Sequence, residues 1–181
     1  SGGAIYNSGS INSITGSFKE NYAQGNYAFG GAIYNYGSIG DITGEFKDNY
    51  AIATGNYAMG GALYGYGGAR FGNITGNFTG NYAKDTSTSS SYGGTAGGAI
   101  SMINGNGIGN ITGDFISNTV TASTMSGGGL IGNYSLGNSC SSTIGDIIGD
   151  FISNSVELKG NYVYGGGLIG NYSSVSATIG N

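Results

Sequence analysis

Short apolar pieces alternate with glycine, asparagine, aspartate and serine along the whole chain. Each piece has about four to eight residues, is rich in Ile, Phe and Tyr, and is bounded by turn residues, a pattern that predicts β-strands rather than helices. Residues 30–50, which read GGAIYNYGSIGDITGEFKDNY, contain three such pieces. Altered copies of this unit recur along the sequence, so we expect a repeat protein with three short strands in each unit.

The repeats carry the same apolar residues at equivalent positions. Aligned on the Phe of the third piece, successive units lie 28, 32, 37 and 36 residues apart. We treat residues 1–181 as a single domain with approximate repeats at 1–28, 29–58, 59–95, 96–126 and 127–164 and a partial repeat at 165–181. The first piece predicts an apolar column of Ile5, Ile33, Leu63, Ile100, Leu130 and Leu168. The third predicts a column of Phe18, Phe46, Phe78, Phe115 and Phe151. The second predicts two more columns, Ile11, Ile39, Phe71, Ile108, Ile144 and Ile179, and Ile14, Ile42, Ile74, Ile111 and Ile147.

These columns indicate that equivalent strands of successive repeats stack in register. A coil with three short strands per turn is a parallel β-helix, or β-solenoid, in which neighbouring turns together bury a core that no single turn could form. We therefore expect an all-β chain of about six turns, with stacked strands spaced about 4.8 Å apart.

A polar column and pairs of glycines accompany the apolar columns. The F-x-x-N piece ends in Asn, which we expect at a bend, with its amide bonded to backbone or to the Asn of the next turn, because an unpaired buried amide is costly. The Gly pair before each first strand is expected to provide either a positive φ or a close approach of stacked backbones. The segments between each Asn and the next Gly pair vary in length and are expected to be loops, at residues 23–29, 51–59, 83–96, 119–126 and 155–164. The Asn column comprises Asn21, Asn49, Asn81, Asn118 and Asn154.

Composition narrows the possible partners and the location. Only 8% of residues are charged, and the five basic residues are scattered, so the chain lacks the basic stripe of a nucleic-acid-binding protein. No segment approaches the ~20 apolar residues of a membrane-spanning helix, so we expect no direct membrane insertion of this segment. The single cysteine, Cys140, has no intrachain partner for a disulfide. A polar, tyrosine-rich and nearly uncharged chain favours an extracellular or bacterial cell-surface location.

Two short motifs alternate through the repeats. The first reads GGA[IL] or GGGL and begins at Gly2, Gly30, Gly60, Gly97, Gly127 and Gly165; the second, F-x-x-N, begins at each Phe of the third column. Their alternation resembles the polymorphic outer-membrane proteins, an autotransporter-type adhesin family whose passenger regions carry many copies of both motifs. The resemblance implies a right-handed parallel β-helix displayed outside the cell, with adhesion as its role. The chain departs from this family in its low cysteine content and in showing no C-terminal translocator.

The residues offer little for catalysis. There is no His, and the acids occupy repeat positions, as Asp41 and Asp146 do where other repeats have Ser or Asn. We therefore expect no catalytic residue, no cofactor and no dedicated metal site, and a carbohydrate-active β-helix enzyme is only a second alternative. Asp114 and Asp150, on adjacent turns, are either two solvated carboxylates or ligands that share a Ca²⁺.

The tyrosines are the candidate contact surface. Tyr34, Tyr36, Tyr64 and Tyr66 follow the first apolar column, and stacked rings with polar rims suit a protein or a carbohydrate surface. In the other interpretation, the rings only stiffen the solenoid through cross-strand contacts. The main hypothesis is a non-catalytic extracellular or cell-surface structural and adhesive β-solenoid. The alternative is a subunit of a self-assembling fibre, joined head to tail through uncapped end turns.

Overall fold

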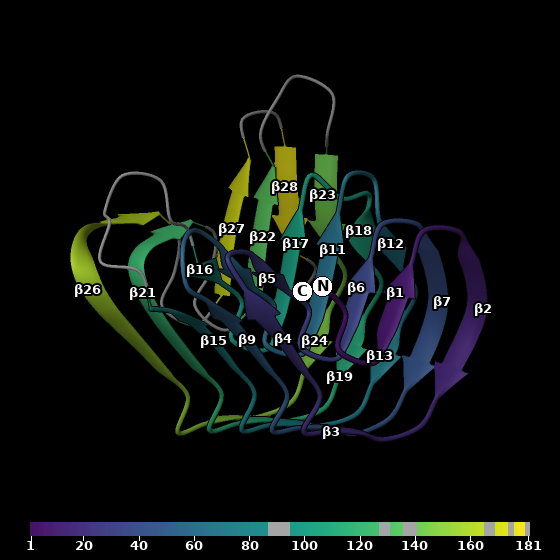
Figure 1. The fold of residues 1–181 in the computed structure, drawn as a ribbon. Coiled ribbons are helices and arrows are strands. Elements are labelled where there is room, and N and C mark those ends of the chain that lie inside the picture. Colours follow the sequence, from purple (N-terminus) through teal and green to yellow (C-terminus); the bar gives the residue numbers. More distant parts are fainter. Residues whose placement is uncertain (87–94, 127–130, 136–140, 165–168, 174–175, 180–181) are drawn as a thin grey trace.

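Parallel strands from successive repeats stack into a β-solenoid (Figure 1). The computed structural model describes residues 1–86, 95–126, 131–135, 141–164, 169–173 and 176–179. These residues form strands, turns and bends, with no helix among them. The predicted all-β parallel fold is confirmed, because every strand pairing is parallel and joins one repeat to the next.

The first predicted strand of each repeat lies in a six-stranded sheet in the middle of Figure 1. Ile5, Ile33, Leu63 and Ile100 pair in register, as predicted. The prediction that Leu130 and Leu168 continue this column was wrong. Ile100 pairs with Ile131, and Ile131 pairs with Ile169, so the column continues one residue after each leucine. Both leucines lie outside the described residues. The strands are β1 (Ile5–Asn7), β6 (Ile33–Asn35), β11 (Leu63–Tyr66), β17 (Ile100–Ile103), β22 (Ile131–Ser135) and β27 (Ile169–Ser173).

The second predicted strand forms a nine-stranded sheet with the expected register of both apolar columns. Ile39 and Ile42 are both buried although a regular strand would turn residues three apart to opposite faces, so the regular alternation is interrupted between them, at Gly40. In later turns the interruption divides the segment into two strands. The strands are β2 (Ser10–Thr15), β7 (Ser38–Thr43), β12 (Arg70–Phe71), β13 (Ile74–Thr75), β18 (Gly107–Ile108), β19 (Ile111–Thr112), β23 (Ser141–Ile144), β24 (Ile147–Ile148) and β28 (Ser176–Ile179).

The third predicted strand forms a five-stranded sheet that carries the Phe column. Each Phe ring stacks on the next, with centroids 4.6–5.1 Å apart and planes within 3–6° of parallel. Phe46, Phe78 and Phe115 are fully buried, so this ladder is one wall of the core. The strands are β3 (Phe18–Lys19), β8 (Phe46–Lys47), β14 (Phe78–Thr79), β20 (Phe115–Ile116) and β25 (Phe151–Ile152).

A fourth side of the coil consists of an eight-stranded sheet that the sequence did not predict. It occupies the segments expected to be variable loops, whose described parts are largely strand. Ala23, Ala51 and Ala83 pair in register and are buried, so small side chains let the two halves of this side pack closely. The strands are β4 (Tyr22–Gly25), β5 (Ala28–Phe29), β9 (Tyr50–Ala53), β10 (Ala58–Met59), β15 (Tyr82–Asp85), β16 (Thr95–Ala96), β21 (Thr119–Ser126) and β26 (Ser155–Tyr164).

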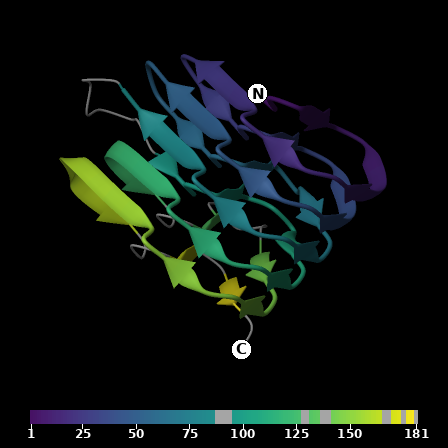
Figure 2. The ribbon, with the colours of Figure 1, turned by 90° about the horizontal axis from the view of Figure 1, so that it is seen from below.

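The interior has two parts. The larger part is filled by the Ile, Leu and Phe columns, and the smaller part by six alanines of the fourth side. Seen from below, the turns follow one another from the first repeat, drawn in purple, to the last described strands, drawn in yellow (Figure 2). About four turns are seen complete, slightly fewer than the six expected, since the last two turns are described only in part.

The Asn column is a continuous ladder of hydrogen-bonded side chains. The Nδ2 of Asn49 donates to the Oδ1 of Asn81 at 2.9 Å and to the carbonyl oxygen of Phe18 at 2.9 Å. The Oδ1 of Asn81 also accepts the backbone N–H of Asn49 at 3.0 Å. Asn81 repeats the arrangement with Asn118, and Asn118 with Asn154. Both expected kinds of partner, backbone and neighbouring Asn, are therefore used in every inner turn.

The Gly pair serves both of the purposes that the sequence left open, one at each glycine. Gly60 has a φ of 65°, in the left-handed region that favours glycine. Gly61 has an ordinary φ, but a Cβ there would overlap the carbonyl oxygen of Gly98 and lie 2.7 Å from the backbone nitrogen of Tyr82. The first glycine of the pair therefore turns the chain into the first strand, and the second allows the backbones of neighbouring turns to approach closely.

Candidate functional site

Eight aromatic rings gather on the outer side of the first three turns. Alternation along β6 and β11 directs Ile33 and Leu63 into the core and the following Tyr34 and Tyr64 to the opposite face. The short strands β5 and β10 return the chain beside this sheet and bring Phe29 and Met59 to it. We call this set the aromatic cluster; it comprises Tyr6, Tyr27, Phe29, Tyr34, Tyr36, Tyr57, Tyr64 and Tyr66.

The structure brings all four predicted contact tyrosines together in this cluster. The ring centroid of Tyr34 is 5.2 Å from that of Tyr64, and the Tyr64 centroid is 6.3 Å from that of Tyr66. Tyr36 and Tyr66 are 6.1 Å apart and tilted by 31°. Tyr36 also rests against Gly67, since a Cβ at Gly67 would lie 2.6 Å from its ring. The cluster is therefore a packed surface rather than a set of independent side chains.

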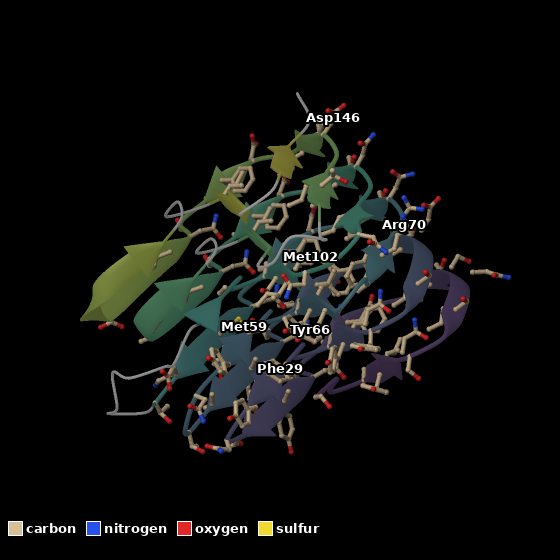
Figure 3. The ribbon with its side chains drawn as sticks, turned by 90° about the horizontal axis from the view of Figure 1, so that it is seen from above. Phe29, Met59, Tyr66, Arg70, Met102 and Asp146 are labelled. Carbon is tan, nitrogen blue, oxygen red and sulfur yellow. The ribbon has the colours of Figure 1, made fainter. Side chains whose placement is uncertain are left out.

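Its base is buried and its rim is exposed. Tyr64 is only 3% exposed and stacks on Phe29 at 4.9 Å, beside Met59 and Ala96. Tyr36 is 48% exposed and Tyr66 is 38% exposed. In Figure 3, Met59 and Tyr66 lie side by side, between Phe29 and Met102 along the solenoid. None of the cluster residues carries a charge, so the surface combines apolar ring area with phenol hydroxyls.

The Tyr64 hydroxyl is an unusual feature of the base. It makes no hydrogen bond with any other described residue. Burial raises the pKa of Tyr64, and the nearby phenols of Tyr34 and Tyr66 add to the effect. Burial likewise raises the pKa of Tyr34. The neutral phenol is thus strongly favoured in the folded state, and its oxygen has no hydrogen-bond partner among the described residues.

Replacing this phenol changes how stability responds to alkaline pH. Because the folded-state pKa of Tyr64 lies above the unfolded value of about 10, its stabilising contribution is complete below about pH 10 and is lost as the pH rises further. We expect Tyr64→Phe to reduce the loss of unfolding free energy between about pH 10 and pH 11 by roughly 1 kcal/mol. Urea unfolding at both pH values measures this difference. Tyr22→Phe, at an exposed ring, is the control, and equal pH dependence in both variants would contradict the prediction.

The cluster ends at the fourth turn because the repeat changes there. Ser101 takes the place of tyrosine in the column of Tyr34 and Tyr64, and Ile103 pairs with Tyr66 and replaces it in the fourth turn. The neighbouring inward position also changes, since Gly65 leaves space that Met102 fills; a Cβ at Gly65 would lie 2.7 Å from the Met102 sulfur. Among the residues whose side chains the structure describes, the ring contacts of the cluster are therefore confined to the first three turns.

A second tyrosine ladder lies on the fourth side, outside the four-tyrosine contact surface predicted from the sequence. Tyr22, Tyr50 and Tyr82 stack at 5.2 and 4.9 Å with planes within 10° of parallel. Neighbouring rings therefore cover each other's faces within the ladder, while Tyr22 at its N-terminal end remains 56% exposed. This ladder fits the expectation that stacked tyrosines stiffen the solenoid.

Acidic side chains at the repeat positions, including Asp114 of the possible Ca²⁺ pair, bond to backbone. The Oδ1 of Asp114 accepts the backbone N–H of Asp150 at 2.9 Å, and the Oδ1 of Asp41 accepts that of Asn73 at 2.8 Å. Within the described part of the chain, no three His, Cys, Asp or Glu residues are grouped closely enough to hold a metal ion. The acids thus repeat what Asn side chains do at equivalent positions, as with the Oδ1 of Asn77 and the N–H of Asp114.

A groove lies on the outer side of the second sheet, away from the aromatic cluster. It is lined by Arg70, Asn106 and Thr143 and by the backbone of glycines such as Gly107 and Gly109. Arg70 is exposed and forms no ion pair with the residues that the structure describes. Figure 3 shows Arg70 to one side of the line from Phe29 to Met102. The groove offers one cation and no acid–base pair.

Half of the cluster lies outside the contact surface that was predicted from the sequence. Tyr27, Phe29 and Tyr57 lie in or beside segments that were expected to be loops, so their proximity to Tyr34 and Tyr64 could not be foreseen. The Ala-Phe and Ala-Met dipeptides before two of the Gly pairs, at residues 28–29 and 58–59, were a usable signal of two further strands. Aromatic and Met side chains there pair in register with the next turn.

No family model matches the chain, and neither a curated protein nor a solved structure is significantly similar to it. Among the residues that the structure describes, no helix is long and apolar enough to span a membrane.

Proposed function

We propose that this chain is a non-catalytic structural and adhesive β-solenoid that acts outside the cell, at the bacterial cell surface. The observation that carries the proposal is the aromatic cluster, in which Tyr36 and Tyr66 remain 48% and 38% exposed above a buried base. Exposed aromatic patches on soluble proteins are typical of contact sites. The ladders of the solenoid hold this surface rigidly, so little side-chain entropy is lost when a partner binds.

The scaffold supports a non-catalytic role. The side-chain oxygens of Asp41 and Asp114 accept backbone N–H groups of the next turn, and so each has a structural part to play. The repeat motifs that resemble autotransporter adhesins favour display at the cell surface.

Adhesion is tested with beads that carry the purified protein. We expect coated beads to attach to a panel of epithelial cell layers and mucin-coated surfaces more often than uncoated beads do. The double variant Tyr36→Ala/Tyr66→Ala is expected to reduce attachment to the level of uncoated beads. Tyr22→Ala, at an exposed ring outside the cluster, serves as the matched control and is expected to retain attachment. Attachment of the wild-type protein no greater than that of uncoated beads on every surface would overturn the proposal.

A further inference from the structure

The aromatic cluster has properties that point to the chemical class of its ligand. It contains no charged side chain, so it offers an ionic partner neither attraction nor a means to offset the cost of desolvation. It presents apolar ring area and phenol hydroxyls side by side. A ligand that matches both must have apolar faces and many uncharged hydroxyls.

The available ring faces lie at the rim. Tyr36 is tilted by 31° to Tyr66, unlike the parallel rings of the Tyr22 ladder, so neighbouring rings do not cover these two completely. On the N-terminal side of Tyr36, the equivalent position of the first repeat is Ser8, which adds no ring. Both side chains are well exposed. A flat ligand can therefore lie against Tyr36 and Tyr66.

The base supplies an unsatisfied polar atom. The Tyr64 hydroxyl has no hydrogen-bond partner among the described residues. Only 3% of the Tyr64 surface is exposed to solvent. A buried hydroxyl without a partner costs free energy, and a ligand hydroxyl that reaches it recovers that cost. This requirement favours a sugar over an aliphatic chain.

We infer that the aromatic cluster binds a neutral polysaccharide, with the C–H faces of its hexoses against Tyr36 and Tyr66 and one sugar hydroxyl directed to Tyr64. The inference rests on the proposed adhesive function and names the class of surface that the solenoid recognises. Turns stacked about 4.8 Å apart place the two rim tyrosines in successive rungs, so the chain of sugars runs along the solenoid.

Affinity gel electrophoresis tests the inference with soluble polysaccharides as probes. The neutral probes are mixed-linkage β-glucan, galactomannan and dextran, and the acidic probes are polygalacturonate and hyaluronate. We expect at least one neutral probe to retard the native protein and the acidic probes to leave its mobility unchanged. Tyr66→Ala is expected to weaken binding at least about ten-fold and Tyr64→Phe, which removes only the hydroxyl, about three- to ten-fold. Tyr22→Ala is expected to bind like the wild-type protein.

The outcomes separate this inference from the adhesive function. The inference fails if no neutral probe retards the protein, if acidic probes retard it equally, or if Tyr66→Ala binds like the wild type. If coated beads still attach but no polysaccharide retards the protein, the adhesive function is supported and the inference that the ligand is a polysaccharide is overturned. Binding to collagen- or fibronectin-coated wells that Tyr66→Ala abolishes would assign the cluster to a protein partner instead. A circular dichroism spectrum of each variant equal to that of the wild type excludes unfolding as the cause of lost binding.

Discussion

We expect Gly61→Ala to lower the free energy of unfolding by about 5 kcal/mol or to prevent folding. The added Cβ would overlap the carbonyl oxygen of Gly98 and lie 2.7 Å from the backbone nitrogen and carbonyl carbon of Tyr82. All three atoms are backbone atoms, so no side-chain rotation can relieve the overlap. The neighbouring turns must separate, and that breaks interstrand hydrogen bonds such as Gly61 N–H to Gly97 O.

Gly16→Ala is the matched control for this prediction. No atom lies within 4 Å of the position that a Cβ at Gly16 would occupy, and its φ is not in the left-handed region. We expect this change to alter stability by less than about 1 kcal/mol, with a tendency to stabilise by restricting the unfolded chain. Urea unfolding followed by circular dichroism compares the two variants, and similar midpoints would refute the stacking role of the Gly pair.

Asn81→Ala is expected to cost about 4 kcal/mol, because its side chain satisfies several buried groups at once. Its loss removes the acceptor of the Asn49 side-chain amide and of the Asn49 backbone N–H. It also removes the donor to the carbonyl oxygen of Phe46. Asn49 and Asn81 are fully buried, so water cannot replace these bonds without opening the turn.

Asn73→Ala provides the comparison at an exposed Asn ladder. The Oδ1 of Asn73 accepts the backbone N–H of Asn110 at 3.0 Å, but this bond is open to solvent. We expect a loss of at most about 1 kcal/mol there, because water can take its place. The unfolding free energies come from the same urea experiment. Equal losses at Asn73 and Asn81 would show that the buried ladder has no special energetic weight.

The core columns could be predicted because each one repeats a large apolar residue at a fixed place. Ile42, Ile74 and Ile111 illustrate this, since like residues stacked in the inner turns are all fully buried. The column of Ile100 was extended to Leu130 because two overlapping Gly pairs, at Gly127 and Gly128, allow two alignments of the fifth repeat. Pairing of Ile100 with Ile131 corresponds to the alignment that starts at Gly128.

The fourth side escaped prediction because its buried residues are alanines. Ala23 and Ala51 give a weak hydrophobic signal, and their segments differ in length from repeat to repeat, which is also typical of loops. Half of the aromatic cluster was not predicted, because its residues lie in the same segments, which were expected to be loops. Tyr34 and Tyr64 belong to a predicted strand, but Phe29 reaches them only because β5 returns beside that strand.

The asparagine ladder has a consequence for how the protein ages chemically. Deamidation begins when the backbone nitrogen after an Asn attacks its side-chain carbonyl carbon, and heat-labile Asn residues are a recognised weakness of proteins. After Asn81 that nitrogen belongs to Tyr82 and donates to the carbonyl oxygen of Asn49 at 3.0 Å. The amide of Asn81 is held by two further bonds. The buried ladder is thus protected from this reaction, and slow chemical damage falls first on exposed sites such as Asn106, which precedes a glycine.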